Sequence, residues 1–169
     1  SAAPYPTEKT VVQLFEEQVA ATPAAIAIED GERRLTYAQL NERANQLAHY
    51  LQRQCVTTGQ LCALCTDRST ETIVGILGVL KAGAAYVPID PAYPAARIAT
   101  MIEESSPKVI LTQHSLADRF RELDKEAVRD SQLAIRNSII FCLDSEGSQI
   151  ANEATTNPAS TASPADLAY

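Results

Sequence analysis

One stretch, residues 80–94, constrains the fold of this chain more than any other; it reads LKAGAAYVPIDPAYP. Lys81 and Gly83 are typical of the last turn of a helix and the position just beyond it. The run 86–89 predicts a short strand. Pro88 within it favours a strand end or a sheet edge, because proline has no N–H to donate. The prolines at 91 and 94 then predict a rigid turn, so the stretch is typical of a sheet with helices packed on its faces.

The same alternation of helix and strand continues along the chain. Asp30-Gly31 predicts a hairpin turn, and Pro94 can take the first position of the helix that follows it. Apolar spacing predicts helices over 11–21, 36–51, 70–82, 95–104 and 116–123, and strands over 25–28, 33–35, 61–65, 86–89, 108–112 and 139–143. We therefore predict an α/β fold, a mostly parallel sheet flanked by helices.

The helix after Thr36 has the clearest pattern. Thr36 is a good N-cap, and Gln39 three residues later completes a capping box. The apolar stripe is Tyr37, Leu40, Ala44, Leu47, Ala48 and Leu51, and the predicted polar side holds Asn41, Glu42, Arg43, Asn45 and Gln46.

The helix predicted over 70–82 is apolar on most sides and contains Gly75 and Gly78. Because each glycine costs up to about 1 kcal/mol in a helix interior, we expect both to allow close approach to a strand. The helix predicted over 95–104 should turn Ile98, Met101 and Ile102 inward.

Charge and hydropathy narrow the classes of partner. The net charge of −7 disfavours nucleic acid and anionic lipid, which both need clustered Lys and Arg. The longest apolar run, 73–80, is far short of the roughly 20 residues that a membrane helix needs. Residues 1–6 lack the basic and apolar segments of a secretory signal. We expect a cytoplasmic protein.

The four cysteines are interpreted as packing residues. Cys62 and Cys65 have a spacing that metal and redox sites use, but residues three apart in a strand point to opposite faces. No second Cys or His pair stands at ligand spacing. Cys55 and Cys142 are isolated, and we expect them to pack as well.

Several separate stretches resemble the adenylation domains of nonribosomal peptide synthetases, in the order that this family has them. Residues 4–6 with 10–18 are similar to the start of such a domain, although the family often has His where Val12 stands. Residues 35–41 resemble the first core motif, with Gln39 where Glu is usual, and 80–94 resemble the second. Residues 91–97 and 106–112 extend the match, which is weakest over 113–139.

The resemblance implies a domain organisation. Residues 1–9 would be the linker from an upstream condensation domain, and 10–143 the first α/β subdomain of the large N-terminal lobe. The Ser/Thr/Ala-rich part, 144–166, would be a mobile loop. Residues 167–169 would begin the strand that leads to the phosphate-binding loop. A chain that ends there should expose a sheet edge and apolar surface, and so associate.

The resemblance also implies an activity. The family joins an amino acid to ATP, with Mg²⁺, giving aminoacyl-AMP and pyrophosphate. The aminoacyl group then passes to a phosphopantetheine thiol on a carrier domain. The implied partners are the remainder of the same domain, the adjacent condensation and carrier domains, and the amino-acid substrate.

The groups that do this chemistry in the family lie beyond Tyr169. They are the Gly/Ser/Thr-rich phosphate loop, the catalytic lysine and the acidic residue that recognises the substrate amino group. The six glycines of this chain give no phosphate-cradling pattern. We therefore assign no catalytic, cofactor-binding or metal-binding residue here, and we expect the segment alone to be an inactive scaffold that binds no cofactor.

Some polar residues invite a catalytic interpretation, but a structural one is favoured for each. Asp90 beside Pro91 is expected to be a turn acceptor, and Tyr86 to be partly buried against a helix. His49 and His114 are expected at the surface, and Glu103 and Glu104 at a solvated helix end.

Two other classes of function stay open. One is a non-catalytic α/β binding or docking module, which the acidic surface and the missing site allow. The other is an acyl-CoA or aryl-acid ligase of the same superfamily, although the turn over 88–94 resembles the peptide-synthetase branch more closely.

Overall fold

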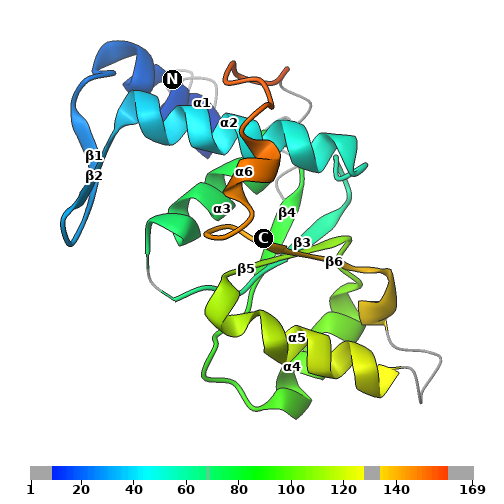
Figure 1. Ribbon diagram of the computed structural model, residues 1–169. Coiled ribbons are helices and arrows are strands. Elements are labelled where there is room, and N and C mark those ends of the chain that lie inside the picture. The colour runs from blue at the N-terminus through cyan, green and yellow to red at the C-terminus, as the bar shows by residue number, and fades with distance from the viewer. Residues whose placement is uncertain (1–8, 68, 128–133, 160–169) are drawn as a thin grey trace, which may run out of the picture.

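Figure 1 shows the computed structural model, which describes residues 9–67, 69–127 and 134–159. The predicted linker (except Lys9), the end of the predicted loop from 160 on and the predicted strand start at 167–169 lie outside the described residues. The elements are α1 (Val11–Ala21), β1 (Ile26–Asp30), β2 (Arg33–Thr36), α2 (Tyr37–Arg53), β3 (Leu61–Leu64), α3 (Thr70–Lys81), β4 (Ala85–Pro88), α4 (Ala95–Ser105), β5 (Val109–Thr112), α5 (His114–Ala127), the 3-10 helix η1 (Ala134–Asn137), β6 (Ile139–Cys142) and α6 (Gly147–Ile150).

A four-stranded parallel sheet in the order β4-β3-β5-β6 forms the centre of the molecule. The strands β1 and β2 form a separate antiparallel hairpin that turns at Gly31, whose φ is +62°. The parallel sheet and the Asp30-Gly31 hairpin are thus confirmed. Pro88 ends the edge strand β4 as predicted. Because Ile89 N donates to Leu64 O, the nitrogen of Pro88 faces away from β3, and its missing N–H removes no sheet hydrogen bond.

Helices cover both faces of this sheet, as Figure 1 shows: α1, α2, α3 and α6 lie on one side, and α4 and α5 on the other. Along β3 the side chains alternate between the two cores. Cys62 and Leu64 belong to the core under α2 and α3, and Ala63 and Cys65 to the core under α4 and α5. Burial on both faces explains why the apolar runs of the sheet strands show no polar alternation.

Capping boxes begin both α1 and α2. Thr36 Oγ1 accepts from Gln39 N at 3.1 Å, and Gln39 Oε1 accepts from Thr36 N at 3.0 Å, as predicted. Thr10 and Gln13 make the same reciprocal pair at the start of α1. The Thr-x-x-Gln spacing at Thr10 is the sequence signal that would have predicted it.

The two glycines of α3 differ in what they approach. A Cβ on Gly75 would come within 2.7 Å of Leu64 Cδ1 in β3, so the predicted close approach to a strand is confirmed there. A Cβ on Gly78 would instead meet Leu47 of the helix α2 at 2.5 Å. The prediction was wrong for Gly78, because α2 packs between this part of α3 and solvent.

Residues 144–159, predicted as a mobile loop, are placed by two kinds of contact. The short helix α6 docks Ile150, which is 8% exposed, into the core. The chain after it lies along α2 and is held by side chains of that helix. These bonds go to backbone carbonyls, so they leave no apolar periodicity in the sequence.

Several side chains lie elsewhere than predicted. Asn45, predicted on the polar side of α2, is fully buried under residues 155–157. His49, predicted at the surface, is half-buried by the same segment. Cys55, predicted to pack, is exposed just after α2, in the left-handed region at φ 63°. Pro94 is the N-cap of α4 and not its first residue.

Candidate functional site at the carboxyl edge of the sheet

The carboxyl ends of β3 and β4 open onto a cavity of about 550 Å³. In parallel α/β sheets, ligands bind outside the carboxyl ends of the strands. Here the connection from β3 leads to one side of the sheet and the connection from β4 crosses to the other, so the strand order reverses between β3 and β5. The polar groups of this edge are those of Thr66, Asp67, Thr72 and Asp90, and the apolar wall is made by Leu64, Ile76, Tyr86, Ile89 and Tyr93.

At the point between β3 and β5 where the strand order reverses, hydrogen bonds within the chain join the two strand ends. Thr112, fully buried at the end of β5, donates its hydroxyl to Cys65 O at 2.7 Å. Beyond it, Asp67 N donates to Gln113 Oε1 at 2.9 Å, and Gln113 Nε2 donates to Asp67 Oδ2 at 3.0 Å. The carboxylate of Asp67 is therefore engaged in joining the two strand ends.

The hydroxyls of Thr66 and Thr72, beside this pair, donate their protons in the same direction. Thr72 Oγ1 donates its proton to Asp67 O at 2.7 Å. Because a hydroxyl has one proton, the 2.6 Å contact between Thr66 Oγ1 and Thr72 Oγ1 is made by the Thr66 proton. The row of hydroxyls ends on a carbonyl, and it holds no base that could activate a nucleophile.

Residues of the 80–94 stretch hold the turn after β4 and line part of the cavity. Asp90 Oδ1 accepts from Ala92 N at 2.9 Å, which confirms the turn-acceptor prediction. Tyr86 is half-buried against the α2–α3 core, as expected. Arg97 stacks on Tyr93 with its guanidinium carbon 3.8 Å from the ring centroid, beyond the cavity wall.

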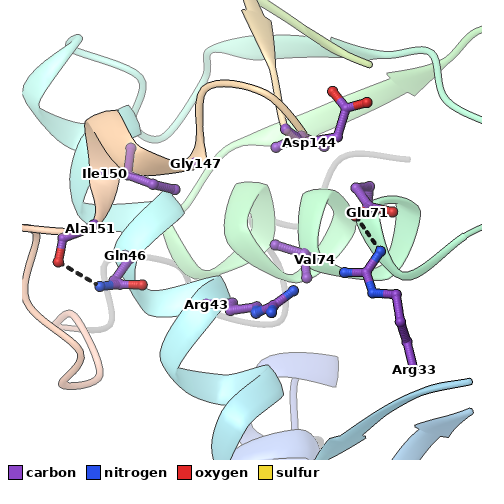
Figure 2. A pocket seen from close by; sticks show the side chains of 10 residues that line it. Arg33, Arg43, Gln46, Glu71, Val74, Asp144, Gly147, Ile150 and Ala151 are labelled. Atoms are coloured by element: carbon purple, nitrogen blue, oxygen red, sulfur yellow. Dashed lines mark hydrogen bonds and ion pairs between the residues drawn. The ribbon is translucent and has the colours of Figure 1, made fainter. Parts of the chain in front are cut away.

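A second cavity, of about 330 Å³, lies on the other side of α3 (Figure 2). In Figure 2 Arg33 reaches from β2 toward Glu71 of α3, and Arg43 and Gln46 project from α2. Arg33 Nη1 donates to Glu71 Oε1 at 3.0 Å. Burial alone would raise the pKa of Glu71, but hydrogen bonds from its own backbone and from Arg33 outweigh it and lower that pKa. Asp144 is also engaged, since it accepts from His114 N at 2.8 Å.

The helix α3 is thus the wall between the two cavities, and the β1–β2 hairpin holds its first turn. Glu71 and Val74 line one cavity, while Thr72 and Ile76 line the other. Asp30 Oδ2 at the hairpin end accepts from Thr70 N at 3.3 Å and from the Thr70 hydroxyl at 3.4 Å. This carboxylate supplies the helix-capping bond that the N-cap residue Ser69 does not make.

The cysteines and histidines form no reactive group. Burial raises the pKa of the Cys62 thiol to about 12, and burial chiefly raises that of Cys65 to about 11, so both stay protonated at neutral pH. They lie on opposite faces of the sheet, as predicted. His114 is exposed, in agreement with the sequence prediction. Within the described ranges, no three His, Cys, Asp or Glu side chains are placed to hold a metal ion.

The described residues do not fit MgATP. A phosphate needs backbone N–H groups, glycines or cations that face an open cradle. Gly75 and Gly78 face leucine side chains, and nothing lies near Gly31 or Gly147. Lys81 faces no such cradle, because its side chain is fully buried and its ammonium is paired with Glu16.

Glu103 and Glu104 are exposed at the end of α4, as predicted. In addition, no helix in the described part of the chain is long and apolar enough to cross a membrane.

Comparison with known proteins agrees with the α/β fold described above. Residues 15–169 match the family model described as AMP-binding enzyme. A linear gramicidin synthase protein from Brevibacillus parabrevis is 49% identical over 98% of this chain. Tyrocidine synthase 2 from the same organism is 44% identical over all of it, and bacitracin synthase 1 from Bacillus licheniformis is 46% identical over 73%. The chain spans only 2%, 4% and 2% of the lengths of these relatives.

Solved structures show the same fold. A nonribosomal peptide synthetase, FmoA3, with bound α-methyl-L-serine-AMP superposes with a TM-score of 0.82 at 29% identity, over 100% of this chain and 17% of the other. A fatty acyl CoA synthetase from Mycobacterium tuberculosis superposes with a TM-score of 0.77 at 24% identity, over 92% and 30%. The chain belongs to the AMP-binding enzyme family, and its sequence and fold are those of the N-terminal portion of a nonribosomal peptide synthetase adenylation domain.

Proposed function

We propose that this chain is part of an enzyme that activates an amino acid for nonribosomal peptide synthesis. The complete domain joins the amino acid to ATP, giving aminoacyl-AMP and pyrophosphate. It then loads the aminoacyl group as a thioester on a phosphopantetheine carrier domain. One observation carries the proposal: the family match over residues 15–169 coincides with a fold that superposes, at a TM-score of 0.82, on a synthetase solved with an aminoacyl adenylate.

In this proposal the 169 residues are scaffold and have no activity alone. Two features of the described residues support that role. The polar groups at the carboxyl edge of the sheet bond to one another, and the glycines form no phosphate cradle. ATP and Mg²⁺ would be held by the remainder of the domain.

The proposed organisation follows the sequence prediction. Residues 1–9 link to an upstream condensation domain, 10–143 form the first α/β subdomain, 144–166 form the connecting segment, and 167–169 begin the next strand. The relatives are far longer than this chain, which supports the presence of further domains. A cytoplasmic location stays a prediction.

Amino-acid-dependent ATP–pyrophosphate exchange tests the proposal. The chain alone should give no exchange above the blank, and a rate near that of an intact adenylation domain would overturn its inactivity. Mixing it with a separately produced segment that starts after Tyr169 should restore exchange. Exchange with fatty or aryl acids only would favour the neighbouring ligase class. Failure of the two pieces to associate would favour the non-catalytic module.

A further inference from the structure

A buried ammonium joins three separate parts of the chain at the end of α3. The Lys81 side chain has no exposed surface. Its Nζ donates to Glu16 Oε1 of α1 at 2.6 Å and to Asn157 Oδ1 at 3.4 Å, and it lies 5.7 Å from the Phe15 ring centroid. Burial lowers the pKa of Lys81, and the hydrogen bond and charge of Glu16 oppose that effect. Because an unpaired buried charge is strongly unfavourable, the ammonium holds α1 and residue 157 together.

Asn157 is the acceptor on which this network converges. Its Oδ1 accepts from Asn41 Nδ2 and Asn45 Nδ2, each at 3.0 Å, as well as from Lys81. Asn45 is fully buried, and its Nδ2 also donates to Thr155 O at 2.7 Å. Asn157 itself is exposed. The two amide donors at 3.0 Å match the two lone pairs of its oxygen, and Lys81 Nζ is a longer third contact, so these bonds hold residue 157 against α2 and the end of α3.

Neighbouring side chains of α2 hold the backbone that leads to Asn157. Gln46 Nε2 donates to Ala151 O at 3.1 Å. His49 Nε2 lies 2.8 Å from Thr156 O, and because a carbonyl can only accept, His49 carries its proton on Nε2. Arg53 and Glu153 form an ion pair at the far end of the helix. We call this set of contacts between residues 151–157 and the side chains of α2 and Lys81 the α2 clasp.

The α2 clasp shortens the stretch of chain between the last held residue and the predicted strand at Leu167. Ile150 is the last core residue before the clasp, and it stands 17 positions before Leu167, where the next strand is predicted. With Asn157 fixed, the last anchor stands only ten positions before Leu167. For a flexible tether, effective concentration falls roughly as the −3/2 power of length, and the change from an anchor at Ile150 to one at Asn157 would correspond to about a twofold gain.

We propose that Lys81 is a positioning residue for the adenylation reaction, because by holding Asn157 on α2 it anchors the chain ten residues before the strand that leads to the phosphate-binding loop. The proposal rests on the proposed function. In this proposal Lys81 does more than end the helix α3, because it also holds the segment around Asn157.

The first experiment tests the clasp in the chain itself and needs no activity. The Glu153 side chain is 12% exposed in its ion pair with Arg53, so a glutamate-specific protease should cleave after it faster when the segment opens. At low protease concentration the cleavage rate should then follow the opening equilibrium. Lys81→Met and Asn157→Ala should each speed this cleavage about tenfold, and Lys81→Arg should speed it less. The matched controls Lys125→Met and Asn137→Ala change exposed residues elsewhere and should leave it unchanged. Wild-type cleavage rates in both clasp variants would overturn the proposal.

The second experiment measures ATP–pyrophosphate exchange in the adenylation domain that carries this chain. Lys81→Met and Asn157→Ala should raise KM for ATP about twofold and change kcat less. Lys81→Arg should restore part of the loss. Open clasps with unchanged KM and kcat would overturn the positioning role and leave the proposed function intact. A wild-type domain without exchange would instead contradict the proposed function, while the protease result would still report on the clasp.

Discussion

Gly78 of α3 lies directly against Leu47 of α2, so closely that a Cβ on the glycine would come within 2.5 Å of Leu47 Cδ2 and 3.0 Å of Leu47 Cβ. Leu47 is fully buried in the core that both helices share. The contact involves the base of the leucine side chain as well as its flexible end, so the neighbour has little freedom to move away. The glycine therefore sets the distance between the two helices.

Gly78→Ala should destabilise the chain by about 1–3 kcal/mol, the usual cost of overpacking a core. The helix propensity of alanine offsets this by up to about 1 kcal/mol. Urea unfolding followed by circular dichroism measures the change. Gly147→Ala is the matched control, because no atom lies within 4 Å of its Cβ position in α6, and it should be neutral or slightly stabilising. Equal effects at the two glycines would contradict the packing argument.

Thr36→Ala should cost about 1 kcal/mol, because it removes the side-chain acceptor of the α2 capping box. Thr36→Ser keeps a hydroxyl at the same place and should retain most of the stability. The two variants are compared by their midpoints of urea unfolding, at a constant slope of the free energy of unfolding against urea concentration. A serine variant as unstable as the alanine variant would show that the methyl group matters and the cap does not.

Alkaline pH should destabilise the chain through its buried thiols. Burial raises the pKa of Cys62 from 9.0 to about 12 in the folded state, so above pH 9 the unfolded chain loses this proton while the folded chain keeps it. Stability that is complete below pH 9 is then lost as pH rises, by up to about 1.4 kcal/mol per pH unit.

The measurement is the free energy of unfolding at pH 8 to 11. Cys62→Ala should give a flatter pH dependence than the wild type. Cys55→Ala, which removes an exposed thiol, should keep the wild-type slope. Identical slopes in all three proteins would refute a role for the Cys62 thiol.

Thr112→Val should cost about 1–2 kcal/mol, because it removes the buried hydroxyl that donates to Cys65 O. Valine has nearly the same shape, so the loss reports the hydrogen bond and not a cavity. Thr100→Val makes the same change at an exposed position of α4, where the hydroxyl bonds Ala96 O, and should stay within about 0.5 kcal/mol of wild type. Chemical denaturation of both variants decides the point.

The features that the sequence predicted correctly are local. Thr36 with Gln39, Asp30 with Gly31, and Gly83 after α3 each act within a few residues, so their patterns are visible in the chain. The parallel sheet followed from the order of apolar segments. The position of residues 151–157 did not, because Asn157 meets partners more than 70 residues away through single polar contacts that have no period.

The candidate site was equally hard to foresee. The sequence predicted that no catalytic or binding residue could be assigned, and it described Asp90 correctly as a turn acceptor. It contains no sign that Asp67 and Gln113 meet across the strand ends, since they stand 46 positions apart in the chain. The sequence indicates only a helix-end cation at Lys81, because the burial of this lysine depends on α1 and residue 157 together.

The hydrogen bonds between the β1–β2 hairpin and α3 connect the hairpin to both cavities. Asp30 and Arg33 hold the first turn of the helix whose two sides line the two cavities. The first turn of α3 is therefore joined to the hairpin by both a carboxylate and a guanidinium. The hairpin, which pairs with no strand of the parallel sheet, therefore contributes to the walls of both cavities through the helix that it holds.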